Sequence, residues 1–181
     1  PILTGSIGES AGSLFKTEYF DLGDAYLAQT GQLYLEAACA AFRKVFCLGP
    51  TFRAEKSKTR RHLAEFWMME AEVAFNDSEQ NMRLQEEMIA AVVPRVAETC
   101  GEQLRSLERD LEALKRIQPP FPRLSYDQAV ETLRERGFAI SWGEDIGGDE
   151  ETALSESFRK PVFIYNYPRQ EVAHGVFLDK S

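Results

Sequence analysis

The chain has 181 residues, enough for one domain with a sizeable core and too few for two large ones. It is 44% hydrophobic and 28% charged, as is ordinary for a globular protein, and no apolar run approaches the length that spans a bilayer, so we expect no membrane contact. A formal net charge of -8 argues against a broad nucleic-acid-binding face, although a local basic patch could still meet phosphate.

Cysteine and histidine are too scarce to suggest a metal centre. Cys39, Cys47 and Cys100 form no CxxC pair, so the sequence predicts neither a zinc site nor a disulfide framework. His62 and His174 are too few for a histidine-rich cluster. Free cysteines favour a reducing, cytoplasmic location. Because the chain does not begin with methionine, we expect it to be a fragment of a longer protein.

The first part of the chain predicts short strands followed by one clear helix. Residues 1–15 are typical of a strand end that runs into a Gly- and Ser-rich loop, and residues 16–32 are typical of short strands between turns. Residues 33–45, LYLEAACAAFRKV, combine strong helix formers with apolar spacing. This segment predicts a helix packed on a core.

Residues 45–55 and 62–75 predict two strands of a long antiparallel hairpin, joined by the polar loop KSKTRR. Because side chains alternate along a strand, one face of this hairpin gathers charged and aromatic residues. They are Arg53 and Glu55 on the first strand and His62, Phe66, Glu70 and Glu72 on the second.

Residues 78–117 are strongly helical in composition, and Pro94 is expected to kink or divide the segment. Five apolar residues recur at steps of three and four, which predicts one apolar stripe on a charged helix that covers a sheet. They are Leu104, Leu107, Leu111, Leu114 and Ile117. The stripe is too short to favour a coiled coil.

The last third predicts two further helices and two strands. Ser125 and Gln128 have the spacing of a capping box that opens a helix ending at Gly137. Residues 138–143, FAISWG, are interpreted as a strand, residues 149–159 as a helix, and residues 161–168 as a buried strand. The predicted fold class is α+β, a mainly antiparallel β-sheet flanked by helices, in one domain.

The charges of the hairpin allow two explanations. The basic loop alone is typical of a solvated hairpin tip. Arg53 and the glutamates Glu65, Glu70 and Glu72 lie among apolar neighbours, where a charge is costly unless it is paired. A structural Arg–Glu pair is one solution, and a ligand carrying both phosphate and an ammonium or amide is the other. The sequence has neither a P-loop nor a Rossmann glycine pattern, so arginines on a sheet would have to hold the phosphate.

The stretch GPTFRAEKSKTRRHLAEFWMMEAEVAF resembles motif 2 of the class II aminoacyl-tRNA synthetases of the aspartyl/asparaginyl subgroup, in the form found in asparaginyl-tRNA synthetases. The similarity extends through PILTGSIGESAGSLF, AYLAQTGQLYLEA, SWGEDIGGDEE and VFIYNYP, and so covers nearly all of the chain. The resemblance implies that residues 1–181 are part of a class II catalytic domain, with motif 2 at about 49–75. Motif 1, motif 3 and the anticodon-binding domain are expected to lie outside this chain.

For ATP, the resemblance implies a catalytic role for Arg53, which would contact the α-phosphate and the substrate carboxylate. Glu55 would position the adenine or the hairpin loop, and Phe66 would stack on adenine. Arg61 and His62 would reach the outer phosphates. The substrate carboxylate attacks the α-phosphorus in line, so catalysis rests on positioning and neutralisation of charge.

For the amino acid, the resemblance implies that Glu9 meets the substrate ammonium and that Gln29 and Gln32 line the same pocket. Glu70 would accept from a side-chain amide. Aspartyl enzymes of the family carry a lysine where this chain has Leu35. A neutral wall beside a carboxylate favours asparagine over aspartate.

The resemblance also implies the cofactors and partners. They are ATP with Mg²⁺, whose main ligands are expected outside this chain, together with asparagine, tRNA(Asn) and a second subunit in a homodimer. No metal ligand is assigned within the chain, which alone is expected to be incomplete.

Two alternatives stay open from the sequence. One is an archaeal-type asparagine synthetase, related to these synthetases, that amidates aspartate through a β-aspartyl-adenylate. The other is a non-catalytic, synthetase-like binding module.

Overall fold

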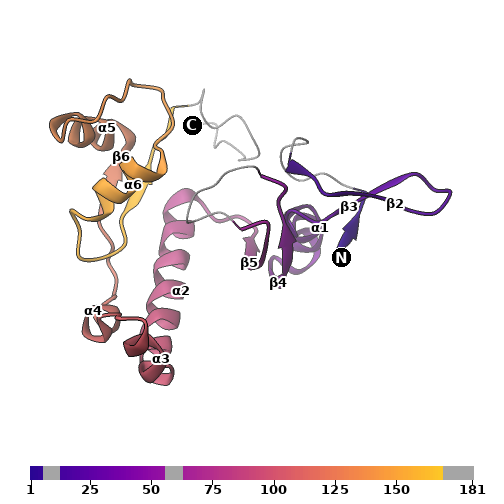
Figure 1. The fold of residues 1–181 in the computed structure, drawn as a ribbon, viewed down its shortest axis with the longest axis horizontal. Coiled ribbons are helices and arrows are strands. Elements are labelled where there is room, and N and C mark those ends of the chain that lie inside the picture. The colour runs from indigo at the N-terminus through magenta and orange to yellow at the C-terminus, as the bar shows by residue number, and fades with distance from the viewer. Residues whose placement is uncertain (6–12, 56–62, 169–181) are drawn as a thin grey trace. The chain divides into compact units, whose positions relative to one another are not determined.

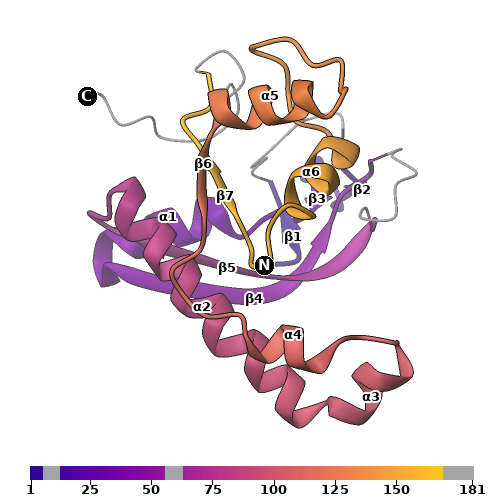
Figure 2. The same ribbon diagram turned by 90° about the vertical axis from the view of Figure 1, so that its left-hand side faces the viewer.

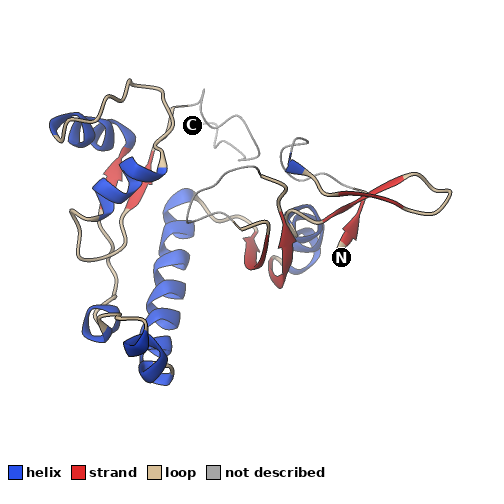
Figure 3. Ribbon diagram, in the orientation of Figure 1, coloured by secondary structure: helices blue, strands red, loops and turns tan. Residues whose placement is uncertain are grey.

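The computed structural model describes residues 1–5, 13–55 and 63–168 (Figure 1). Contacts within the chain divide it into two compact units, Pro1–Asn76 and Asp77–Ser181. Helices and strands are shown in Figure 3.

The first unit begins with a small antiparallel sheet in the order β1-β3-β2. Its strands are β1 (Leu3–Thr4), β2 (Lys16–Glu18) and β3 (Asp24–Leu27). The expected helix follows as α1 (Gln32–Phe42), with Leu35 and Cys39 buried. Short strands and helix are therefore confirmed.

The predicted long hairpin is confirmed as β4 (Lys44–Phe52) and β5 (Glu65–Val73), which run side by side in Figure 2. Cys47 pairs with Glu70, and Thr51 pairs with Phe66. Helix α1 packs against both strands. Burial alternates along the strands, so one face is covered and the other exposed, as a two-residue period requires.

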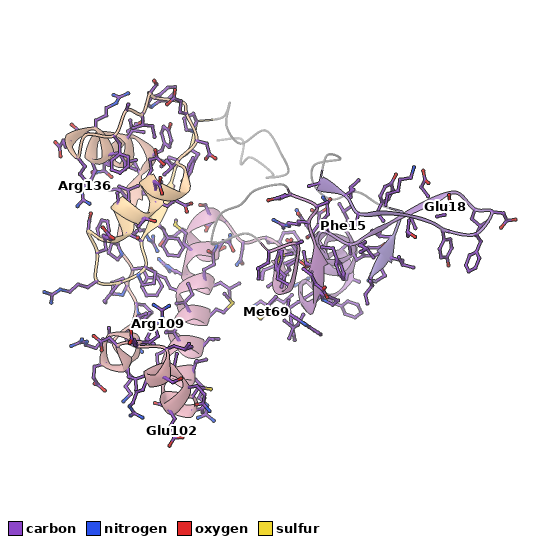
Figure 4. The ribbon with its side chains drawn as sticks, in the orientation of Figure 1. Phe15, Glu18, Met69, Glu102, Arg109 and Arg136 are labelled. Atoms are coloured by element: carbon purple, nitrogen blue, oxygen red, sulfur yellow. The ribbon has the colours of Figure 1, made fainter. Side chains whose placement is uncertain are left out.

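The exposed face of the hairpin is largely apolar. Its members are Phe46, Leu48, Trp67 and Met69, the last of which is labelled in Figure 4. Glu65 is exposed as well, so the expectation that its charge is buried and needs a partner is wrong. Glu70 and Glu72 lie half-buried on the other face.

The second unit opens with α2 (Ser78–Thr99), whose N-terminus is closed by a capping box between Asp77 and Gln80. The helix continues through Pro94, so the expected division at this residue is wrong. One lost backbone hydrogen bond does not end a helix of 22 residues that is capped and packed. The helix ends instead at Thr99, and α3 (Gly101–Ser106) follows directly after Cys100.

The expected single helix bearing the leucine stripe is also wrong. The chain leaves the helical conformation after Ser106, and Glu108 has a positive φ of 56°. Asp110 then caps α4 (Leu111–Lys115), because its carboxylate accepts from the backbone N–H groups of Glu112 and Ala113, both at 3.0 Å. The local cap interrupts the helix that the spacing predicts.

The remaining elements surround a small core. They are β6 (Arg123–Ser125), α5 (Tyr126–Glu135), α6 (Gly148–Ser155) and β7 (Phe163–Tyr165). The core residues are Tyr126, Ala129, Val130, Leu133, Ile140, Ile146 and Leu154. Strands β6 and β7 pair in parallel, which was not expected, and the two helices lie in the crossover between them. Strand β7 is half-buried rather than buried.

The capping box of Ser125 and Gln128 is confirmed at the start of α5. The predicted strand at residues 138–143 is wrong, because its backbone groups are satisfied locally. Ile140 accepts from the Arg134 guanidinium at 2.9 Å, and the Ser141 N–H donates to the Glu144 carboxylate at 2.8 Å. Side chains therefore replace the partner strand.

Tyr126→Phe is expected to lower the free energy of unfolding by about 1–3 kcal/mol. The buried hydroxyl donates to the Glu144 carbonyl at 2.6 Å and accepts from the Gly143 N–H at 2.9 Å, so its loss leaves both groups without this partner. Urea unfolding measures the change. Tyr165→Phe, on half-buried β7, is the control and is expected to change little, and equal losses in the two variants would contradict the assignment.

Candidate active site

The end of β4 brings Arg53 beside Phe66. The Arg53 N–H donates to the Ala64 carbonyl at 3.0 Å, which extends the hairpin one step beyond the last strand pair. The guanidinium carbon lies 5.6 Å from the centroid of the Phe66 ring. Both side chains are half-buried, so the face predicted from strand alternation is confirmed for these two residues.

Gln29 ties three segments of the first unit together. It is 3% exposed, and its amide donates to the Ser13 carbonyl at 3.1 Å and to the Ser13 hydroxyl at 2.9 Å. The same Ser13 carbonyl accepts from the Ala54 N–H at 2.8 Å. Ser13 therefore joins Gln29 to Ala54, the residue after Arg53. Glu55 comes next in the chain and is exposed.

Glu70 closes the N-terminus of α1. Its carboxylate accepts from the Thr30 hydroxyl and from the Gly31 N–H, the latter at 2.7 Å. The cap residue Gly31 has no side chain of its own to offer, so a strand residue supplies the anion that a helix N-terminus favours. Gln32 follows, with its side-chain amide donating to Glu36 at 3.0 Å.

A shallow pocket of about 200 Å³ lies beside this carboxylate. Thr30, Gly31, Cys47 and Glu70 line one part of it, and the rest is lined by Ala28, by further residues of β4 and by Pro1 and Ile2. Glu70 is the one charged side chain among the described residues of the lining, and the other walls are backbone, polar and apolar groups, which suits a small polar ligand.

The carboxylates near Glu70 repel one another. Burial raises the pKa of Glu72, and the negative charges of Glu36 and Glu70 raise it further. Burial and the same Glu70 charge raise the pKa of the Cys47 thiol, which favours its protonated form. This side of the hairpin therefore presents negative charge that favours an ammonium or amide donor.

Glu72→Gln is expected to stabilise the protein slightly at neutral pH, with a rise in Tm of about 1–2 °C. Because folding raises the pKa of Glu72, its ionised form costs stability, and the cost appears as pH rises through the raised pKa. Below about pH 4 the carboxyl is neutral in both states and the gain should vanish. Thermal melts across pH check this, with exposed Glu65→Gln as control; a gain that persists at low pH would contradict the explanation.

The structure brings together some predicted site residues and leaves others undescribed. Arg53 lies beside Phe66, while Glu70 lies at the start of α1 with Gln32. Glu9, Arg61 and His62 lie outside the described residues. Sequence reasoning missed Ser13, Thr30, Gly31 and Cys47 as contacts of the site. The one local signal for the contact between the start of α1 and Glu70 is a glycine between two glutamines just before a predicted helix.

Two further properties concern only the residues that the structure describes. Within residues 1–5, 13–55 and 63–168, no three His, Cys, Asp or Glu side chains are grouped so that they could hold a metal ion. In the same parts of the chain, no helix combines the length and apolar character that crossing a membrane requires.

Comparison with known proteins identifies the family of the chain. Residues 1–180 match the family model of tRNA synthetases class II (D, K and N), and the chain belongs to this family. Two similar proteins are named as asparagine--tRNA ligases. The chain is 54% identical over 181 residues to the Asparagine--tRNA ligase of Herpetosiphon aurantiacus and 55% identical over 174 residues to that of Chloroflexus aurantiacus. Each alignment covers 93% of this chain and 40% of the relative.

A solved structure is similar to this chain as well. The asparaginyl-tRNA synthetase of Pyrococcus horikoshii, complexed with asparaginyl-adenylate, superposes with a TM-score of 0.89 at 46% identity, covering 94% of this chain and 39% of that one. The predicted resemblance and the α+β fold class are therefore confirmed. The chain spans about two-fifths of the length of the relatives it matches.

Proposed function

We propose that this chain is the catalytic-core portion of an ATP-dependent asparagine--tRNA ligase. The complete protein would activate asparagine to asparaginyl-adenylate and transfer it to tRNA(Asn). The observation that carries the proposal is the placement of Arg53 against Phe66 at the end of the β4–β5 hairpin, within a chain whose relatives are asparagine--tRNA ligases.

In the proposed reaction a carboxylate oxygen of asparagine attacks the α-phosphorus of ATP, and pyrophosphate leaves. Arg53 neutralises the charge that builds on the α-phosphate, and Phe66 provides a planar face for adenine. Glu55, Arg61 and His62 would serve the adenine and the outer phosphates, as the family motif predicts. No side chain acts as a nucleophile. Mg²⁺, whose main ligands we place outside this chain, would help to neutralise the charge of the phosphates.

The preference for asparagine rests on charge. Glu70 lines the pocket and already repels the Glu72 carboxylate, so a second carboxylate on the substrate would be repelled as well. Leu35 is 7% exposed on α1 and offers no cation to balance an aspartate. Glu70 would accept from the amide of asparagine, Glu9 would meet the ammonium, and Gln29 and Gln32 would line the same amino-acid pocket.

We assign residues 1–181 to one partial catalytic domain with motif 2 at about 49–75, and place motif 1, motif 3 and the anticodon-binding domain elsewhere in the complete chain. A homodimer and a cytoplasmic location belong to the same proposal.

Aminoacylation by the full-length protein tests this function. Radiolabelled asparagine is expected to become attached to tRNA(Asn) in the presence of ATP. Production of free asparagine from aspartate and ammonia, without charged tRNA, would instead establish an asparagine synthetase. If neither charged tRNA nor free asparagine is produced, the proposal is overturned and a binding module is favoured.

A further inference from the structure

A cluster of four residues, Thr30, Gly31, Cys47 and Glu70, joins the start of α1 to the β4–β5 hairpin. We propose that Gly31 and Cys47 are positioning residues that hold the Glu70 carboxylate in one orientation at the amino-acid pocket. This inference rests on the proposed function and adds two residues to which the family resemblance assigned no role.

The contacts fix the carboxylate from two sides. The Gly31 N–H donates to Oε2 of Glu70 at 2.7 Å, and the Thr30 hydroxyl donates to Oε1. Cys47 is the cross-strand partner of Glu70, and its Sγ lies 3.7 Å from the same Oε2. An ionised carboxylate has about four lone-pair positions, so acceptor capacity remains for a substrate amide.

Cys47 contributes as a donor. Burial and the charge of Glu70 raise the pKa of the thiol and keep it protonated, so the S–H can point at the carboxylate. A thiolate at this place would repel Glu70. The geometry of the cross-strand pair, with Sγ directed at Oε2, is what makes the contact possible.

Gly31 is required for space rather than for conformation. Its φ is -89°, which any residue adopts. A Cβ added here would lie 2.6 Å from the sulfur of Cys47 and 3.2 Å from Oε2 of Glu70. Any side chain at this position therefore displaces the sulfur, displaces the carboxylate or moves the backbone at the start of α1 away from Glu70.

Four full-length proteins test the proposal in ATP–pyrophosphate exchange with asparagine: wild type, Gly31→Ala, Cys47→Ala and the double variant. Gly31→Ala is expected to raise KM for asparagine about tenfold, equivalent to ~1.4 kcal/mol, while KM for ATP changes less than about twofold. Cys47→Ala removes the sulfur that the new methyl group meets. In the double variant we therefore expect most of the asparagine KM to be restored.

Gly5→Ala is the matched control, since Gly5 is exposed and a Cβ there meets nothing within 4 Å. If Gly31→Ala does not fold, the single variant Cys47→Ala decides, with an expected rise of about two- to threefold in asparagine KM alone. An unchanged asparagine KM in Gly31→Ala, a parallel rise in the KM for ATP, or no rescue by Cys47→Ala would overturn the inference. Absence of asparagine-dependent exchange in the wild type would overturn the proposed function itself.

Discussion

Arg53→Ala in the complete protein is expected to lower the rate of asparagine-dependent ATP–pyrophosphate exchange by roughly 10²–10³-fold without unfolding the protein. Arg53 is the described cation beside Phe66 on the covered face of the hairpin, where charge on the α-phosphate would develop. A guanidinium placed before the reaction stabilises that charge without reorganisation. Circular dichroism and the exchange rate, measured on the same preparation, give the two readouts.

Two further variants sharpen this prediction. Arg53→Lys keeps the charge but loses the planar fork of donors, so an intermediate rate is expected. Arg109→Ala removes an exposed guanidinium from the loop before α4, labelled in Figure 4, and should leave exchange unchanged. Near-normal exchange by Arg53→Ala would refute the role of Arg53, as would an equal loss in Arg109→Ala.

Glu70→Gln is expected to raise KM for asparagine by about 10–100-fold and KM for ATP much less. Glutamine keeps a single acceptor oxygen, so it cannot accept from Thr30, Gly31 and a substrate amide as the carboxylate can. The NH₂ group of the glutamine would also face either the Thr30 hydroxyl or the Gly31 N–H, which both donate to the carboxylate of Glu70. Separate titrations of asparagine and ATP measure the two constants.

The control for Glu70 lies on the same strand. Glu65→Gln makes the same chemical change at an exposed position of β5 and should leave both constants unchanged. Equal increases of the two KM values in Glu70→Gln would indicate general damage to the hairpin. Improved use of asparagine would contradict the proposed recognition outright.

The sequence predicted elements whose signals are local. The two-residue alternation of β4 and β5 placed Phe66, Glu70 and Glu72 on one face, and the structure confirms that placement. The capping box at Ser125 was predictable because both partners lie within one helical turn. Where another local side chain competed, prediction failed, as at Asp110 and at Glu144.

The candidate site was predictable only in part, and mostly through the family resemblance. Motif 2 drew attention to Arg53 and Phe66, whose closeness follows from hairpin pairing. The contact between Gly31 and Glu70 joins residues 39 positions apart, and no local pattern encodes a helix N-terminus capped by a distant strand. Such contacts appear only when the tertiary structure is known.

The most direct test of the central claim is ATP–pyrophosphate exchange by the full-length protein, with asparagine and aspartate offered separately. We expect exchange with asparagine and none with aspartate, because Glu70 can accept from an amide and the described side chains that line its pocket include no cation for a second carboxylate. Exchange with aspartate alone, or with neither amino acid, would contradict the proposal that this chain belongs to an asparagine-activating ligase.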